Sequence, residues 1–213
     1  MLKIKRIEFN PFQVNTYVVY DPVSHEAMIV DPGMLLPEET SLLASFIDSN
    51  GLNVTRIVNT HLHLDHIFGN QAAADLFNTV PYANVADFPL GHDLESQARS
   101  FGIPTSLIRQ PEKFQQLTEG ETFHIGSDEI HAISIPGHSP GGLALYCPAG
   151  EWVITGDSLF RSSIGRTDLP GGNHQQLVTA VRSKLLSLPP QTIVYPGHGP
   201  STTIAAEQTN PYL

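Results

Sequence analysis

The sequence predicts a mixed α/β domain whose strands end in polar side chains at a shared site. Short runs of β-branched and aromatic residues alternate with segments of helical periodicity. Several apolar strands are followed closely by His or Asp, which is typical of sites built where a sheet meets its loops. The 213 residues, 40% of them hydrophobic, can form one sizeable core. Because no linker composition interrupts them, we expect residues 1–213 to form a single domain.

The first half of the chain is expected to contain four strands and two helices. The first helix is predicted at 37–51, because Pro37 and acidic residues open it, apolar residues recur on one face and Gly51 follows as a stop. The second helix is predicted at 67–78 from an alanine-rich run. Strands are predicted at 3–9, 14–20, 26–30 and 54–60.

The second half is expected to be richer in strands. Residues 84–117 contain three prolines and a patchy helical pattern, which predicts short helices and loops. A helix is predicted at 173–189, where apolar residues recur on one side. Two strands are predicted within 122–138, around Gly126-Ser127-Asp128, and further strands at 143–147 and 152–158, with a last strand and turn at 192–200.

Seven side chains are candidate metal ligands. Four of them lie within six positions of the segment NTHLHLDH, and the other three follow predicted strands. Histidine is the commonest metal-binding side chain, and clustered neutral imidazoles have few purely structural uses. The candidates are His61, His63, Asp65, His66, His138, Asp157 and His198.

The types and spacing of these ligands predict a divalent-metal centre with open positions. A closed structural zinc site needs four ligands and often uses paired cysteines, which this chain lacks. His61 and His63 are two residues apart, which suits an extended backbone, whereas Asp65 and His66 are adjacent and must diverge. The spacing therefore indicates two metal ions. Imidazole and carboxylate ligands suit Zn, Fe or Mn, and we expect Zn.

Other reactive residue types have an ordinary structural interpretation. The single cysteine, Cys147, lies in a predicted strand, so we expect it in the core and not as a nucleophile. A lone histidine is more often a surface or packed residue than a ligand. This interpretation covers His25, His92, His124, His131 and His174.

The ordered motifs resemble those of the metallo-β-lactamase superfamily. They are THLHLDH (60–66), PGHSPG (136–141), GDS (156–158) and PGHG (196–199), and the resemblance covers nearly the whole chain. It implies a four-layer αβ/βα sandwich with the metals at one edge. It assigns His61, His63 and His138 to the first metal, Asp65, His66 and His198 to the second, and Asp157 to a bridging position.

Further features narrow the resemblance. Asp157 stands where most zinc β-lactamases have Cys or another residue, and His63 stands where the redox di-iron members have Glu. The segment at 156–172 resembles the glyoxalase II group, the hydroxyacylglutathione hydrolases, and the related persulfide dioxygenases. Full-length glyoxalase II has a C-terminal helical domain that helps to bind glutathione. Only residues 199–213 follow the last ligand here, so we expect the short form without that domain.

The resemblance implies hydrolysis of a glutathione thioester, S-D-lactoylglutathione, to glutathione and D-lactate. A hydroxide that bridges the metals is the implied nucleophile, with Asp65 and Asp157 as the catalytic carboxylates. One alternative is an Fe(II)-dependent glutathione persulfide dioxygenase, and another is a metal-binding module without catalysis. Metal stoichiometry separates the first two, because the dioxygenase uses a single iron.

Three residues are candidates for supporting roles. Asp31 ends a strand, so it either orients an imidazole or caps the turn that follows. Arg161 and Arg166 either meet a substrate carboxylate or form internal salt bridges, for example with Asp168. The segment at 84–117 either covers the site as a lid or is a surface excursion.

Composition disfavours several other function classes. With a net charge of −10, binding to nucleic acid through a basic face is not expected. No apolar stretch approaches the roughly 18–20 residues that span a bilayer, and the N-terminal segment has no apolar core of a secretory signal. We therefore expect a cytoplasmic protein with a small-molecule thioester substrate. Nothing in the sequence indicates the oligomeric state.

Overall fold

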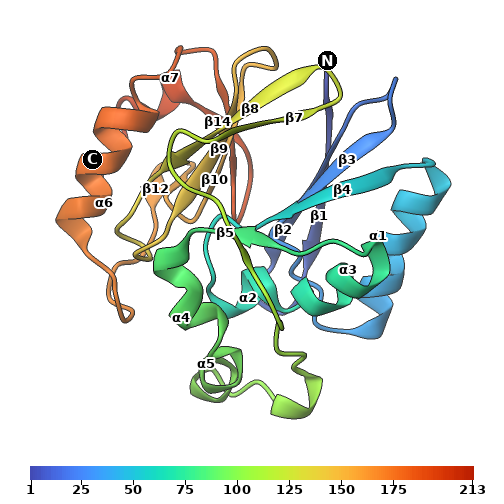
Figure 1. The fold of residues 1–213 in the computed structure, drawn as a ribbon. Helices are drawn as coiled ribbons and strands as arrows, with labels where there is room; N and C mark the ends of the chain where they lie inside the picture. Colours follow the sequence, from blue (N-terminus) through green and yellow to red (C-terminus); the bar gives the residue numbers. More distant parts are fainter.

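The first of two six-stranded sheets is built from the N-terminal half of the chain. The computed structural model describes residues 1–213. The strands are, in chain order and in spatial order, β1 (Lys3–Phe9), β2 (Val14–Tyr20), β3 (Glu26–Val30), β4 (Asn53–Val58), β5 (Tyr82–Ala83) and β6 (Gln115–Gln116). The pairs from β1 to β3 are antiparallel and those from β3 to β6 are parallel. Helices α1 (Pro37–Ser49) and α3 (Asn70–Phe77) cover the outer face of this sheet (Figure 1).

The second sheet is built from the C-terminal half. Its strands are β7 (Thr122–Ile125), β8 (Asp128–Ser134), β9 (Leu143–Cys147), β10 (Trp152–Gly156), β13 (Ile193–Pro196) and β14 (Thr202–Thr203), with the spatial order β14-β13-β10-β9-β8-β7. Helix α6 (His174–Ala180) and the π-helical turn η3 (Val181–Leu185) pack on its outer face through Leu177, Val181 and Leu185.

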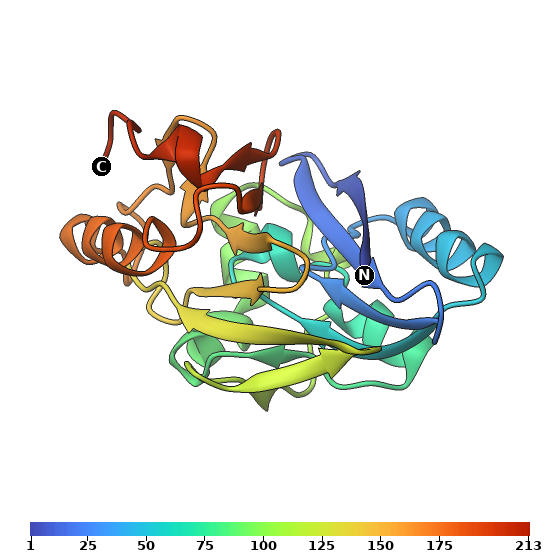
Figure 2. The ribbon, with the colours of Figure 1, turned by 90° about the horizontal axis from the view of Figure 1, so that it is seen from above.

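The main core lies between the two sheets. Tyr17 and Met28 of the first sheet pack in one buried cluster with Leu145 and Ile154 of the second. Helices flank the pair of sheets on both sides, so the layers follow the order helix, sheet, sheet, helix (Figures 1 and 2). The four-layer αβ/βα sandwich that the sequence predicts is thereby confirmed.

Short elements complete the structure. The segment at 84–117 forms short helices and loops, as its sequence predicts. None of the helices combines the length and apolar character needed to cross a bilayer. The short elements are α2 (Leu64–Ile67), η1 (Val85–Asp87), α4 (Phe88–Gly91), α5 (Leu94–Ser100), η2 (Thr105–Leu107), the hairpin of β11 (Leu159–Phe160) with β12 (Ser163–Ile164), and α7 (Ile204–Glu207).

Two helices differ from the sequence prediction. The helix predicted at 67–78 is interrupted, because the N–H of Gly69 donates to the carbonyl of Pro32 at 2.8 Å and the chain turns there between α2 and α3. The helix predicted at 173–189 is regular only to Ala180 and then widens into η3. Such a π-helical turn changes the hydrogen-bond ladder without changing the amphipathic pattern that predicts the helix.

Candidate metal centre

Four segments bring the seven predicted ligands together at one edge of the sandwich. The chain leaves β4 at Val58 and reaches His61 and His63 in an extended conformation, after which α2 carries Asp65 and His66. The other three ligands lie in the loops that follow β8, β10 and β13, namely His138, Asp157 and His198. Because β10 and β13 are parallel neighbours, their carboxyl-terminal ends deliver two of these ligands to the same place.

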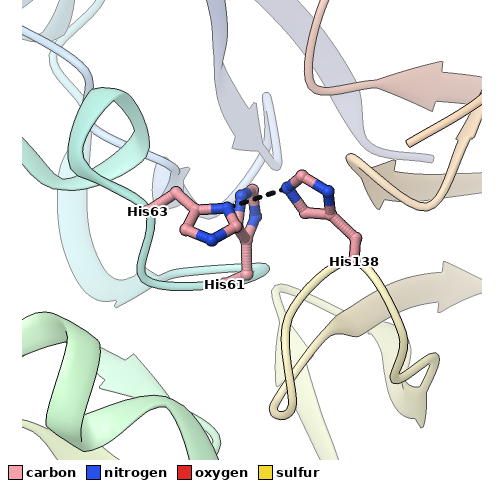
Figure 3. A group of neighbouring side chains, drawn as sticks. All are labelled: His61, His63 and His138. Carbon is pink, nitrogen blue, oxygen red and sulfur yellow. Dashed lines mark hydrogen bonds between the residues drawn. The ribbon is translucent and has the colours of Figure 1, made fainter. Parts of the chain in front are cut away.

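His61, His63 and His138 form the first ligand group. Their imidazoles converge from two loops that are far apart in the sequence (Figure 3). His63 Nδ1 lies 2.8 Å from His138 Nε2, and one nitrogen from each ring lies within 4.8 Å of the others. All three side chains are buried.

Asp65, His66 and His198 form the second ligand group, and Asp157 stands between the two groups. His198 Nε2 lies 3.1 Å from Asp65 Oδ2, and His66 Nε2 lies 3.6 Å from the same oxygen. Asp157 Oδ1 lies 3.3 Å from His66 Nε2, whereas Asp157 Oδ2 lies 3.6 Å from both His138 Nε2 and His198 Nε2. The carboxylate of Asp157 therefore contacts ligands of both groups.

The donor set fits divalent metal ions. Three buried polar atoms at its centre have no hydrogen-bond partner in the protein, namely His61 Nε2, His66 Nε2 and Asp157 Oδ1. Buried polar atoms normally have partners, so these three atoms indicate a cation. A tetrahedral ion with ligands at about 2.0–2.1 Å separates its donor atoms by roughly 3.3 Å, which matches the spacings found here.

Asp31 orients two of the imidazoles. Its Oδ2 accepts hydrogen bonds from His66 Nδ1 at 3.0 Å and from the Thr60 hydroxyl at 2.7 Å. Since that hydroxyl donates to Asp31, it is left to accept from Nδ1 of His61 at 3.1 Å. In both rings Nδ1 then carries the proton, and the Nε2 lone pair is free to bind a metal.

A backbone carbonyl orients a third imidazole. His138 Nδ1 lies 2.7 Å from the carbonyl oxygen of Arg166, so Nδ1 donates and Nε2 faces the other ligands. The approach of this segment depends on Gly165, where a Cβ would lie 1.8 Å from the Asp157 carbonyl oxygen and 3.1 Å from His138 Nδ1. The contribution of Arg166 to the site is thus its main chain.

Burial and the carboxylates act on the imidazoles in opposite directions. Burial lowers the pKa of His61 well below its usual range and, with nearby His138, lowers that of His63 to about 4. Burial also acts to lower the pKa of His66, but three neighbouring carboxylates outweigh it and raise that pKa. Burial acts to lower the pKa of His198, but its hydrogen bond to Asp65 and the charges of Asp157 and Asp65 together outweigh it and raise that pKa.

Acidification is expected to release a metal from the second ligand group before the first. As the pH falls, protons compete first for His66 and His198, whose pKa values are raised, while His61 and His63 stay neutral and able to bind. Metal content per chain, measured after equilibration at steps between about pH 7.5 and 4.5, should fall in two stages. The variant His198→Ala should keep its remaining metal through the first stage. Loss of both metals in one step contradicts the expectation.

A small cavity opens beside the ligands. Its volume is about 180 Å³. Phe12, Phe101, Leu64 and Leu169 supply apolar walls, and Phe12 packs edge-on against Phe101 with ring centroids 5.8 Å apart. A larger hollow of about 560 Å³ lies between β1 and α1 and contains none of the ligands.

The two candidate arginines are placed differently. Arg166 borders the cavity, but its guanidinium forms two hydrogen bonds of 2.7 Å to the carboxylate of Asp168. Arg161 is exposed and does not line the cavity. Phe101 brings the segment at 84–117 to the cavity wall.

Several residues that support the site have no strong signal in the sequence. Tyr17 and Asn15 of β2 hold the loop of His198, because both donate to the carbonyl of Pro196, at 2.7 and 2.9 Å. Thr60 precedes the first candidate ligand, and its residue type alone does not indicate a role at the site. Asp87 lies in the segment at 84–117, whose helical pattern is patchy. Such contacts join residues far apart in the sequence, so they are visible only once the chain is folded.

Comparison with known proteins identifies the family. The sequence profile of the metallo-beta-lactamase superfamily matches residues 9–198. The chain belongs to this superfamily. The resemblance recognised from THLHLDH, PGHSPG, GDS and PGHG is confirmed at that level. Membership of this superfamily agrees with the divalent-metal centre described above.

Relatives of this superfamily member carry several different descriptions. Hydroxyacylglutathione hydrolase GloC of Haemophilus influenzae is 34% identical over 215 residues, which cover 100% of this chain and 98% of GloC. The crystal structure of the BLEG-1 B3 metallo-beta-lactamase has a TM-score of 0.89 and 35% identity, and covers 99% of both chains. The structure of TTHA1623 in a di-iron-bound form has a TM-score of 0.86 and 37% identity, and covers 98% of this chain and 100% of TTHA1623.

Proposed function

We propose that this protein is a metal-dependent hydrolase of glutathione thioesters, of the glyoxalase II type. The proposed reaction converts S-D-lactoylglutathione to glutathione and D-lactate, in the cytoplasm, with two divalent ions bound and zinc as the expected metal. The observation that carries the proposal is Asp157, which contacts both ligand groups beside a cavity. The similarity to GloC over the whole chain supports it.

The metals supply the chemistry that the protein side chains lack. When bound, divalent ions lower the pKa of water to about 7 and polarise a carbonyl oxygen. In the overall reaction the oxygen of water bonds to the thioester carbon, the carbon–sulfur bond breaks, and glutathione leaves as the thiol. Cys147 is buried in β9, so it takes no part as a nucleophile, in agreement with its sequence interpretation.

Asp65 and Asp157 perform the carboxylate roles in this proposal. Asp157 holds the two ligand groups at a fixed separation. Asp65 borders the cavity, so its carboxylate is placed to accept the proton that the attacking water gives up. Burial acts to raise the pKa of Asp65, but the neighbouring His66 and His198 outweigh burial and lower that pKa. The carboxylate is therefore ionised at neutral pH.

The apolar walls of the cavity select the part of the substrate that enters. A volume of about 180 Å³ is below the roughly 300–1,000 Å³ of pockets that enclose drug-sized ligands. The acyl group and the sulfur fit this space, and the peptide part of the thiol carrier then lies at its mouth. Because the guanidinium of Arg166 is bound to Asp168, it is not a free cation for a substrate carboxylate.

Replacing Phe101 with alanine is expected to raise KM for the thioester by about 2- to 10-fold and to leave kcat nearly unchanged. The ring is 40% exposed and forms part of the cavity wall, so its loss weakens binding of the substrate without moving a ligand. Initial rates over a range of substrate concentrations measure both constants. Leu107→Ala is the control, because Leu107 is 38% exposed in the same segment but does not line the cavity. A fall in kcat at constant KM argues against this role.

The decisive experiment combines metal analysis with assays on purified protein. The proposal expects two metals per chain and hydrolysis of S-D-lactoylglutathione, followed as release of free thiol. Oxygen uptake with glutathione persulfide and a single iron per chain instead supports the dioxygenase. Full metal loading without activity on any substrate supports a metal-binding module.

Hydrolysis of β-lactams is a second candidate function. Asp157 disfavours this function, because it stands where most zinc β-lactamases have Cys or another residue. The BLEG-1 structure, however, is 35% identical over 99% of both chains. A β-lactam amide, like a thioester, presents a carbonyl carbon to a metal-activated water. The same preparation should therefore be assayed on a penicillin and a cephalosporin, and a kcat/KM above that for the thioester would reverse the order of the two candidates.

A further inference from the structure

We propose that Asp87 is a positioning residue that fastens together the two loops carrying the first ligand group. The proposal rests on the metal centre of the proposed function and not on the identity of the substrate. Asp87 belongs to η1, in the segment that follows β5, and its side chain is completely buried. It is not one of the seven ligands.

The carboxylate of Asp87 accepts three hydrogen bonds from two separate loops. Its Oδ2 accepts from the backbone N–H of Leu62 at 3.2 Å and from the hydroxyl of Ser139 at 2.7 Å. Its Oδ1 accepts from the backbone N–H of Gly141 at 2.6 Å. Leu62 lies between the ligands His61 and His63, and Ser139 directly follows the ligand His138. A single buried side chain thus connects all three ligands of the first group.

The contact requires close approach of main chain and side chain. At Gly141 a Cβ would lie 2.8 Å from Asp87 Cγ and 2.9 Å from both Asp87 N and Oδ1. A glycine in PGHSPG, one of the motifs in the sequence, therefore makes room for Asp87. Gly141 thus occupies its place in the motif because a side chain there would collide with Asp87, and not because it binds a metal.

Only an ionised carboxylate satisfies all three donors. It is an acceptor at both oxygens, whereas asparagine presents an amide N–H₂ at one of the two positions. In either amide orientation, that group faces a backbone N–H, of Gly141 or of Leu62, and at least one buried donor loses its partner. The substitution Asp87→Asn keeps the volume and removes the connection.

The role is selective for one of the two ligand groups. Asp65 and His66 lie on α2 and His66 is oriented by Asp31, while His198 is held in the loop that Asn15 and Tyr17 fasten. Asp87 makes no hydrogen bond to these segments. Its loss should therefore loosen the first metal and leave the second nearly unaffected.

The test measures zinc affinity by competition with a chromophoric chelator. The comparison uses the His198→Ala background, in which the second group lacks a ligand and the first group dominates tight binding. Adding Asp87→Asn to this background should raise the Kd for zinc by about 10- to 100-fold. In the otherwise unchanged protein, Asp87→Asn should weaken one of two zinc sites and change the other less than about 3-fold.

Glu207→Gln is the matched control for a general loss of stability. Glu207 is also buried and also accepts three hydrogen bonds, from Ser162 N, Thr202 Oγ1 and Asn210 Nδ2, but none of these donors lies in the loops that carry the first ligand group. Both variants should unfold at lower temperature, and only Asp87→Asn should lose zinc affinity. Equal zinc affinities in Asp87→Asn and the parent protein overturn the proposal, as does an equal loss in Glu207→Gln.

A milder variant covers the case in which Asp87→Asn does not fold. Ser139→Ala removes one of the three donors and leaves the carboxylate paired with two backbone N–H groups. It should weaken the first zinc site by about 2- to 10-fold. An unchanged Kd for zinc in folded Ser139→Ala counts against the role of Asp87.

Discussion

Replacing Asp157 with asparagine is expected to lower the proposed thioester hydrolysis by about 10²- to 10⁴-fold, which corresponds to about 3–5 kcal/mol. Asp157 is the one ligand whose two oxygens approach both groups, at 3.3 Å from His66 and at 3.6 Å from His138 and His198. Although burial acts to raise the pKa of Asp157, the surrounding imidazoles lower it, so a full negative charge stands there at neutral pH. Asparagine keeps the shape of the side chain and removes that charge.

Metal analysis and steady-state kinetics on the same preparation check this expectation. Asp157→Asn should retain fewer than two metals per chain, and its kcat should fall together with its metal content. Asp75→Asn provides the control, because Asp75 is an exposed carboxylate whose hydrogen bonds go to Arg109 and Gln71 and not to any candidate ligand. Wild-type kcat in a variant that carries two metals would show that Asp157 does not join the two groups.

The arrangement of the sandwich follows from patterns that are local in the sequence. Runs such as EAMIV and WVITG are short, apolar and bounded by turn residues, and each is a buried strand in the structure. These local patterns do not indicate which strands pair with each other in a sheet. β10 meets β9 through a short antiparallel hairpin, but its parallel pairing with β13 joins residues far apart in the sequence, such as Trp152 and Ile193.

The sequence pattern did not predict very short strands or the positions at which helices are interrupted. A two-residue strand such as β5 or β14 is too short to show a period of two. Gly69 itself has low helix propensity, but the break also depends on a tertiary hydrogen bond to Pro32, which propensity summed over 67–78 does not include. Tertiary contacts therefore decided where local propensity was ambiguous.

The candidate ligands could be selected from the sequence because residue type itself carries the chemistry. Histidine and aspartate beside strand ends are visible in the sequence, and the structure places all seven at one edge. The residues that orient them were less visible. Arg166 acts through a carbonyl oxygen that every residue possesses, and Thr60 acts through a hydroxyl that is common everywhere in proteins. Asp31 was the exception, since an aspartate at a strand end suggested either an orienting role or a cap.

The orienting role of Asp31 predicts a second large effect. In Asp31→Asn, the affinity for both metals should fall by about 10- to 100-fold. The Asp31 carboxylate fixes His66 directly and His61 through the Thr60 hydroxyl, and these two rings belong to different ligand groups. An amide at this position can donate to His66 Nδ1, which moves the ring proton to Nε2 and blocks the lone pair that a metal needs.

Asparagine is the informative replacement because of the backbone at position 31. Asp31 has φ of +52°, in the left-handed region that asparagine tolerates well and alanine does not. Asp31→Asn thus separates the loss of the carboxylate from backbone strain, whereas Asp31→Ala combines both. The free energy of unfolding should be highest for the wild type, lower for Asp31→Asn and lowest for Asp31→Ala. Asp31→Asn should lose about 1–3 kcal/mol relative to the wild type, because buried donors lose an ionised acceptor.

Chelator competition and urea unfolding measure the two consequences of changing Asp31 independently. Asp21→Asn serves for comparison, because Asp21 is also a buried turn carboxylate that accepts from backbone N–H groups, of Val23 and Ser24, but it contacts no imidazole. The variant Asp21→Asn should unfold more easily than the wild type and bind both metals with unchanged affinity. If folded Asp31→Asn binds both metals as tightly as the wild type, then the ring tautomers of His61 and His66 are not set by this carboxylate, and the ligands must be preorganised by packing alone. Weakening of only the His66 site would instead show that the path through Thr60 contributes little to the orientation of His61.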